Sequence, residues 1–204
     1  MRLYQLSVLQ VVDGTATTLK SEADLSSFSF YQRGSVGEFM TFMTKTVAER
    51  TATGQRQSVQ ENSYVAHAYN SGQENLAAVV ITDEEYPVRP AFSLLQKIID
   101  EFLTSVPKAS YSNPSSIDFP AAKVYLAKYQ DPKAADQIMR VQAELDETKI
   151  ILHKTIEGVL QRGENLDNLV ERSNALSAQS KMFYKTAKQV NVSPSEIHTL
   201  SHCL

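Results

Sequence analysis

The sequence has one cysteine, no tryptophan and no long apolar run among its 204 residues. A single cysteine, Cys203, excludes an intrachain disulfide and fits a reducing compartment. The longest wholly apolar stretch, Leu76 to Ile81, has six residues, whereas about 20 are needed to span a bilayer as a helix. The N-terminus lacks the apolar core and the small-residue cleavage site of a secretory signal. We therefore expect a chain of the cytosolic type.

Strong charge of either sign and catalytic motifs are also missing. The 20 basic and 23 acidic side chains give a net charge of −3, without the basic surplus that nucleic acid binding requires. No nucleophile–base spacing, phosphate-binding glycine loop or metal motif stands out. The sequence therefore predicts no catalytic residue, no cofactor and no metal site, and an intrinsic acyl transfer does not follow from it. His67, on a predicted strand, is interpreted as structural.

Residues 1 to about 106 combine strand and helix patterns. Strands are expected at residues 3–11, 15–20, 55–60, 63–69 and 76–82, with Asp13-Gly14 as a hairpin turn. In the first of them, Tyr4, Leu6 and Val8 share one face by period-two spacing. The last is apolar on both faces, as a central strand covered on both sides would be. This pattern predicts a five-stranded sheet with helices on both faces.

Two helices accompany these strands. The first is expected to begin at Ser35, since Glu38 three residues later completes a capping box, and its apolar residues include Val36 and Met40. The second starts near Arg89 and ends before Pro107. At 100° per residue, Phe42 lies off the apolar stripe of the first helix and Phe39 lies at its edge. Phe42 is then either an exposed aromatic, one covered by a neighbouring loop, or part of a docking surface.

From Ile138 onward the apolar residues recur in alternating steps of three and four. This set of sixteen positions, here called the seam, is 138, 141, 145, 148, 152, 155, 159, 162, 166, 169, 173, 176, 180, 183, 187 and 190. A 3.5-residue repeat of this length is typical of a left-handed coiled coil. One straight helix of residues 138–190 would be about 80 Å long, so the segment must find partner helices or break up and fold back. The eleven apolar seam residues are Ile138, Val141, Leu145, Leu152, Val159, Leu166, Leu169, Leu176, Phe183, Ala187 and Val190.

Arg162 is the polar exception in the middle of the seam. Seven seam positions precede it and eight follow it. Burying its guanidinium without partners would cost several kcal/mol, about 3–5 for a broken buried pair, so a bundle must supply oxygen acceptors there. Either Arg162 extends into solvent, or it forms a polar layer that fixes the register of several helices.

These residues carry a family resemblance. The stretches 142–149, 160–167 and 183–187, the last reading Phe-Tyr-Lys-Thr-Ala, resemble an R-SNARE motif. Residues 28–30 and 35–42 resemble a longin domain, and the combination without a transmembrane anchor is similar to the prenylated longin R-SNAREs of the synaptobrevin-like group. The fold this implies is α+β: a profilin-like longin domain with a five-stranded antiparallel sheet, followed by a SNARE coiled-coil helix. The expected division is longin domain 1–130, linker 131–137, R-SNARE motif 138–190 and tail 191–204.

The resemblance implies a mechanism and partners. Three glutamine-bearing SNARE helices would face Arg162, whose five donors suit several carbonyl oxygens, and the bundle would draw vesicle and target membranes together. SNARE-regulating and tethering proteins would be further partners. The transport step would lie on an ER–Golgi, Golgi, endosomal or vacuolar route. In this family an apolar longin surface that includes the phenylalanine matching Phe42, with Phe39 beside it, holds the SNARE segment in a closed, autoinhibited form.

The tail departs from the family pattern. A prenylation box would place a cysteine fourth from the end, whereas Cys203 is penultimate. Family-type lipidation is therefore not expected, although acylation of Cys203 alone is an alternative. The expected location is the cytosol, with peripheral association to Golgi, ER-derived or endosomal vesicle membranes if the chain is lipidated. His198, His202 and Cys203 resemble metal ligands only in residue type, because three such residues in a flexible tail are more often incidental.

Two other functions are compatible with the pattern. The chain could be a longin-type binding or sorting module, or a non-lipidated SNARE variant that joins complexes without driving fusion. A binding module would not require Arg162 to meet glutamines, so this residue separates the alternatives.

Overall fold

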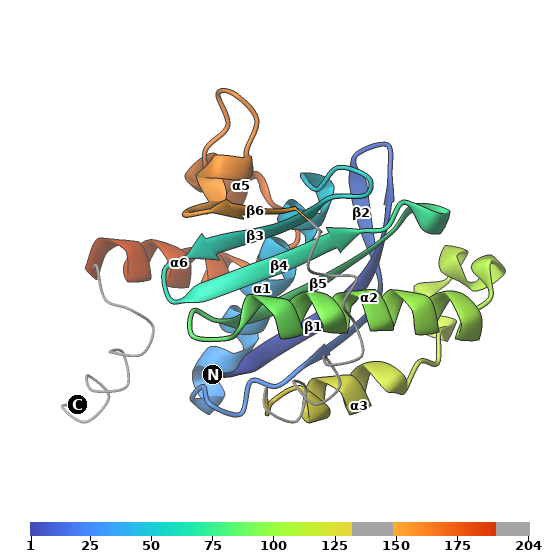
Figure 1. Cartoon of the computed structure of the whole chain (residues 1–204). Coiled ribbons are helices and arrows are strands. Elements are labelled where there is room, and N and C mark those ends of the chain that lie inside the picture. The colour runs from blue at the N-terminus through green and yellow to red at the C-terminus, as the bar shows by residue number, and fades with distance from the viewer. Residues whose placement is uncertain (132–148, 191–204) are drawn as a thin grey trace.

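One sheet of six strands organises the computed structural model, which describes residues 1–131 and 149–190 (Figure 1). The strand order is β2-β1-β5-β4-β3-β6, and every neighbouring pair is antiparallel except β3 and β6, which are parallel. The strands are β1 Leu3–Val12, β2 Thr15–Ala23, β3 Arg56–Glu61, β4 Tyr64–Asn70, β5 Leu76–Asp83 and β6 Ile150–His153.

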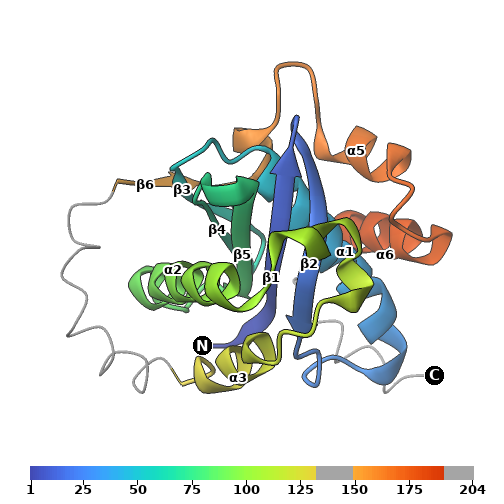
Figure 2. The same ribbon diagram turned by 90° about the vertical axis from the view of Figure 1, so that its right-hand side faces the viewer.

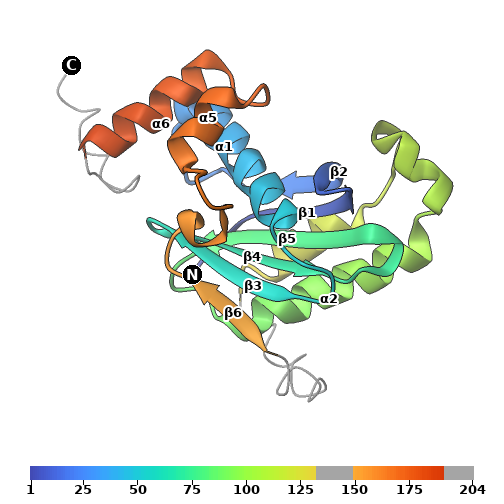
Figure 3. The same ribbon diagram turned by 90° about the horizontal axis from the view of Figure 1, so that it is seen from above.

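Helices cover both faces of this sheet. Figure 3 shows α2 on one side and α1, α5 and α6 on the other, and Figure 2 shows α3 beside the strands β1 and β2. The α-helices are α1 Phe30–Glu49, α2 Val88–Ser105, α3 Ala121–Lys128, α5 Leu166–Arg172 and α6 Ala178–Val190. Short 3₁₀ turns are η1 Gln73–Asn75, η2 Lys108–Ser112, η3 Pro114–Ser116 and η5 Ile156–Val159.

Strand β5 shows why the sheet is covered on both sides. Its residues Leu76, Ala78 and Val80 belong to the core formed with α2 and α3, and the alternate residues Ala77, Val79 and Ile81 belong to the core under α1. Successive side chains of a strand point to opposite faces. A strand that is apolar at every position therefore needs two apolar covers, as the sequence predicts.

The alternation predicted for β1 is wrong at one position. Leu6 and Val8 pack on the α2 side, but Tyr4 packs with the core under α1. The pairing of β1 with β5 shifts register between Leu3 and Gln5. Such an irregularity interrupts the period-two alternation, which places Tyr4 on the face opposite to the one expected.

Helix α1 begins at Phe30, five residues before the predicted start, with Ser29 as its N-cap residue. Ser35 is therefore a buried residue inside the helix. Glu38 does not form the predicted capping box, because its carboxylate accepts hydrogen bonds from residues of α6. The Ser35–Glu38 spacing matches a capping box, but the Glu38 side chain contacts the start of α6 instead.

The prediction of one coiled-coil helix over 138–190 is wrong for this structure. Residues 149–190, here called the C-terminal segment, form β6, η5, α5 and α6, and β6 is the sixth strand that the sequence analysis did not expect. Without partner helices, a straight rod would leave most of its apolar seam in water. The described part of the seam is instead folded back on the rest of the chain, which was one of the two alternatives. Ile138, Val141 and Leu145 lie outside the described residues.

His67 is completely buried between strands and helix α2. Its Nδ1 lies 2.7 Å from Ser58 Oγ, its Nε2 lies 3.3 Å from Thr82 Oγ1, and its ring meets Phe92 edge-on. Thr82 Oγ1 donates its own hydrogen to the carbonyl of Asp83, so it accepts from Nε2 and Ser58 donates to Nδ1. The imidazole is therefore satisfied as a neutral group, and burial lowers the pKa of His67 to about 3.

This pKa predicts a loss of stability in acid. The unfolded chain takes up a proton near the ordinary pKa of about 6.5 while the folded chain does not, so stability falls as the pH drops below that value. Between pH 6.5 and 4.5 the unaltered chain should lose about 2 kcal/mol more unfolding free energy than His67→Gln. Urea unfolding of both chains at several pH values measures the difference. Equal pH slopes would contradict the buried neutral imidazole.

Candidate functional site

Helix α1 is buried on two sides. Val36, Met40 and Met43 face Ala66 and Ile81 of the sheet. On its other side Phe39 stacks on Tyr184 of α6, with ring centroids 5.4 Å apart. Phe42 is only 8% exposed and belongs to the same buried cluster as Leu166, Val170 and Leu176 of the C-terminal segment. Phe39 and Phe42, here called the closure surface, are thus covered by that segment.

The C-terminal segment first joins the sheet at strand β6. Its four residues run parallel to β3, with Ile150 opposite Arg56 and His153 opposite Val59. Just after the strand, the backbone N–H of Ile156 donates to Glu61 Oε2 at 3.1 Å, and the Ile156 side chain is fully buried. The segment is therefore held by backbone pairing before it reaches helix α1.

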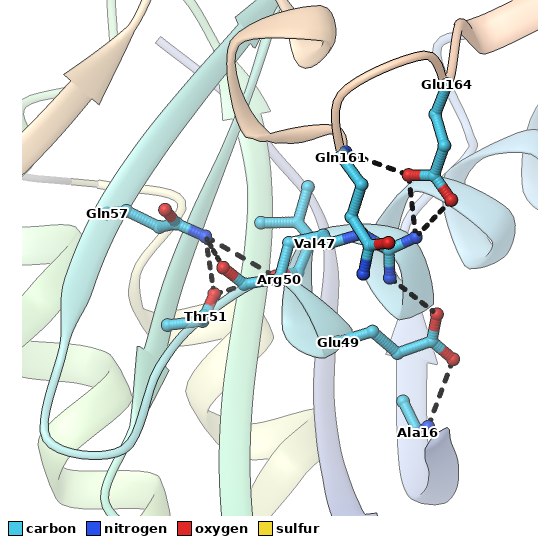
Figure 4. Close-up of polar contacts among 8 residues, drawn as sticks. All are labelled: Ala16, Val47, Glu49, Arg50, Thr51, Gln57, Gln161 and Glu164. Carbon is cyan, nitrogen blue, oxygen red and sulfur yellow. Dashed lines mark hydrogen bonds and ion pairs between the residues drawn. The ribbon is translucent and has the colours of Figure 1, made fainter. Parts of the chain in front are cut away.

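The loop that carries Arg162 is held by an ion pair with helix α1 (Figure 4). Both carboxylate oxygens of Glu164 accept hydrogen bonds from Arg50 Nη2, at 3.1 and 3.0 Å. One of these oxygens also accepts from the backbone N–H of Gln161 at 2.9 Å. The hydrogen bond from Gln161, followed by that from Arg50, lowers the pKa of Glu164. The guanidinium of Arg162 itself remains exposed.

Arg50 is fixed at the end of α1 by its own neighbours. Its Nη1 lies 3.7 Å from Glu49 Oε2, and Glu49 Oε1 accepts from the backbone N–H of Ala16 at 3.1 Å. The side chain of Gln57 donates to Thr51 Oγ1 at 2.7 Å and to the carbonyl of Arg50 at 3.3 Å. Figure 4 shows these contacts on both sides of Arg50. The guanidinium thus meets Glu164 from a well-supported position.

A residue of α1 holds the start of helix α6, which Ser177 caps by accepting the backbone N–H of Ser180 at its Oγ, at 3.2 Å. Glu38 Oε2 accepts from the backbone N–H of Ser177 at 2.8 Å and from Ser180 Oγ at 2.7 Å. These hydrogen bonds lower the pKa of the Glu38 carboxyl. The first N–H groups of a helix have no partner inside it, and a negative charge there is favourable. Glu38 therefore supports the capping residue of α6 and attaches the start of this helix to α1.

Charged pairs join α5 to α6. Lys188 Nζ lies 2.6 Å from Asp167 Oδ2, and Tyr184 donates its hydroxyl hydrogen to Asp167 Oδ1 at 2.9 Å. Lys185 pairs with Glu171. These groups are about half exposed, so each pair contributes about 1 kcal/mol or less. These charged pairs stabilise the arrangement of α5 against α6.

The seating of α6 leaves a small apolar cavity. Its volume is about 90 Å³, and its lining includes Val36, Phe39 and Met40 of α1 together with Phe183 and Tyr184 of α6. An interior of this kind lacks the contacts that a filled core would make. The packing of α6 on α1 is therefore incomplete around this cavity.

The structure separates the predicted seam residues into three groups. Leu166, Leu176 and the polar Ser180 are buried, Val159, Leu169, Ser173 and Phe183 are half-buried, and Leu152, Thr155 and Arg162 are exposed. The backbone of Ala187 and Val190 lies in α6. The side chains of those two residues, like all of Cys203, His198 and His202, lie outside the described part.

Sequence reasoning missed several residues of this site. Glu38, Arg50 and Glu164 carry the polar contacts, and the off-seam residues Ile156 and Val170 are 0% and 1% exposed. A signal for the last two was present. Large apolar side chains at positions that a coiled-coil seam does not use need another surface to cover them.

Comparison with known proteins identifies both halves of the chain. Residues 25–126 match the Longin family, described as a regulated-SNARE-like domain, and residues 137–193 match the Synaptobrevin family. The synaptobrevin homolog ykt6 of Schizosaccharomyces pombe is 56% identical over 192 residues, which cover 94% of this chain and 97% of that protein. The chain belongs to this family of longin-domain R-SNAREs.

Other members of the family are similar over the same extent. The synaptobrevin homologs YKT6 of Eremothecium gossypii and Saccharomyces cerevisiae are 54% and 52% identical over 195 residues, with 94% of this chain and 97% of each relative covered. Both relatives are named as synaptobrevin homologs. The synaptobrevin region implies that the chain has partners in a SNARE bundle.

Membrane spans and metal sites were sought in the described ranges, 1–131 and 149–190. No helix there is long and apolar enough to cross a bilayer. The same residues contain no group of three or more His, Cys, Asp and Glu side chains placed to hold a metal ion.

The ion pair between Arg50 and Glu164 predicts a charge-swap rescue. Arg50→Glu should place two carboxylates together and raise amide hydrogen exchange over residues 156–172 about fivefold, in line with a partly exposed pair. Arg50→Glu combined with Glu164→Arg should restore most of the protection. Lys154→Glu, at an exposed lysine of the same segment, is the control. If the double variant exchanged as fast as the single one, the pair would not hold the loop.

Proposed function

We propose that the chain acts in intracellular vesicle docking and fusion by adding an arginine-bearing helix to a bundle with three glutamine-bearing SNARE helices. In this proposal residues 138–190 are the assembling motif, residues 1–130 regulate it, 131–137 link the two and 191–204 form the tail. The structure described above is then the autoinhibited form, in which the motif is docked on the longin domain.

A single observation carries the proposal: the same side chains cannot serve both states. Leu166 and Leu176 occupy seam positions, yet they are buried against the longin core. In a four-helix bundle these residues would instead pack on partner helices. Docking on the longin domain and joining the bundle therefore exclude each other.

The apolar side chains that each state buries indicate which state is more stable once partner helices are present. The four apolar residues fully buried here are Ile156, Leu166, Val170 and Leu176. At about 1.5–3 kcal/mol each they contribute roughly 6–12 kcal/mol before conformational entropy is subtracted. The eleven apolar seam residues would contribute roughly 15–30 kcal/mol on the same scale. Assembly can therefore replace the closed form.

Arg162 fits the centre of such a bundle. It is exposed in the closed form, so it gives no stability there that its burial among glutamine carbonyls would have to overcome. Its five N–H donors would be satisfied by several carbonyl oxygens in one layer. A single polar layer of this kind fixes the alignment of the helices.

The proposed location is the cytosol with peripheral association to Golgi, ER-derived or endosomal vesicle membranes when the chain carries a lipid. SNARE-regulating and tethering proteins would act on this membrane-associated form. Cys203 is the cysteine that an acyl chain could modify, and stable anchoring generally takes two membrane signals. Intact mass spectrometry of the protein isolated from its own cells determines both the C-terminal end that is present and any attached lipid.

Phe42→Glu should open the closed form. A carboxylate at this buried position would lie in the apolar cluster with Leu166 and Leu176, and burying an unpaired charge costs about 3–5 kcal/mol. Hydrogen exchange over α5 and α6 should rise at least about hundredfold, while strand β5 stays protected. The matched control is Phe30→Glu on the same helix, where the side chain is 78% exposed. Unchanged exchange in α5 and α6 would rule out the closure surface.

Arg162→Ala should impair assembly without opening the chain. Because Arg162 is exposed in the closed form, hydrogen exchange of the free protein should stay as it was. Complexes captured with glutamine-bearing SNARE helices should be fewer or misaligned, as judged by cross-linking between seam positions. Unchanged pairing and transport would reject the central-layer role and favour the binding or sorting module.

A further inference from the structure

The contacts that close the molecule recur along a line beside the seam. Ile156, Val170, Ser177 and Tyr184 directly follow the seam positions 155, 169, 176 and 183, and all four are spaced by multiples of seven. They are here called the clasp face. In a coiled-coil helix with a 3.5-residue repeat these positions would lie one above another, about 100° around the axis from the seam residues that precede them.

Each clasp residue has a partner in the longin domain. Ile156 and Val170 are 0% and 1% exposed in the core under α1. Tyr184 stacks on Phe39 at 5.4 Å between ring centroids, and the backbone N–H of Ser177 donates to Glu38 at 2.8 Å. The clasp face therefore supplies a packing contact in η5, α5 and α6, and the cap of α6.

The residue of the C-terminal segment that pairs with Arg50 also lies outside the seam. Glu164, which pairs with Arg50, is two residues beyond Arg162 and thus on the far side of a continuous helix, about 200° around the axis. In a bundle centred on Arg162 its carboxylate would point away from the partner helices. The closed form is therefore the state that gives Glu164 a specific partner.

Two of the three exposed seam positions among the described residues, the third being Thr155, illustrate the opposite behaviour. Leu152 is 69% exposed and Arg162 is exposed in the closed form. Both would be enclosed in the bundle. The segment thus contains off-seam residues that contact the longin domain, seam residues that the closed form leaves exposed, and seam residues such as Leu166 and Leu176 that the closed form buries.

We infer that the C-terminal segment carries two separable surfaces: the clasp face with Glu164, which binds the longin domain, and the seam, which binds partner helices. The inference rests on the proposed function, since it assigns the seam to a SNARE bundle. Its consequence is that the equilibrium between closed and open chains can be changed without weakening the bundle. The reverse change is also accessible through Leu152.

Two alanine variants test the inference on the full chain. Val170→Ala removes closed-state packing and should raise hydrogen exchange over residues 166–186 about tenfold. Because alanine is the better helix former, the bundle should be as stable as before. Leu152→Ala should leave that exchange unchanged and speed dissociation of the assembled complex about hundredfold.

Both readouts use the same purified variants. Hydrogen exchange is measured on the free chain, and dissociation in urea on complexes with a trio of glutamine-bearing SNARE segments that the unaltered chain selects from a panel. The inference is overturned if Val170→Ala leaves exchange unchanged, or if it weakens the complex as much as Leu152→Ala does. A chain that selects no trio would instead refute the proposed function, and the exchange data would still decide whether the clasp face closes the molecule.

Discussion

Helix α1 lies between the sheet and the C-terminal segment, so its side chains must satisfy two packing surfaces at once. Met40 and Met43 cover the sheet, while Phe39 and Phe42 extend to the other side. A helix with only one apolar stripe would have finished its packing on the sheet. The second apolar side needs a cover, and the C-terminal segment supplies it. The docking of residues 149–190 is therefore explained by the second apolar side of α1, which the sheet leaves uncovered.

Much of the sheet could be predicted because its signals are local. The Asp13-Gly14 turn and the doubly apolar strand β5 indicate their structure within a few residues. The sequence-based predictions were wrong where contacts between residues distant in the sequence determine the local structure. Glu38 has the spacing of a capping box, yet its carboxylate holds the start of α6, about 140 residues further along the chain. The side of β1 on which Tyr4 lies likewise depends on the pairing of β1 with β5, which is distant in the sequence.

The site was predictable only in part, for a related reason. The seam period predicted the positions that partner helices would use, whereas the position of Phe42 off the apolar stripe left three alternatives, of which the family resemblance favoured a docking surface. No sequence period links Arg50 to Glu164, because they lie 114 residues apart and meet only in the tertiary structure. Ile156 and Val170 illustrate a signal that was present: the 3.5-residue repeat leaves them unexplained, and an apolar residue without a place in one assembly is evidence for another.

The parallel pairing of β6 with β3 also bears on solubility. Once residues 150–153 leave, the outer backbone groups of β3 become an open sheet border, with charged side chains only at its ends, Arg56 and Glu61. An uncovered border of this kind is a template on which strands of other molecules can add. The conformation that can assemble with partners therefore also exposes an edge strand that promotes aggregation. In the closed form, β6 protects this edge by pairing with β3.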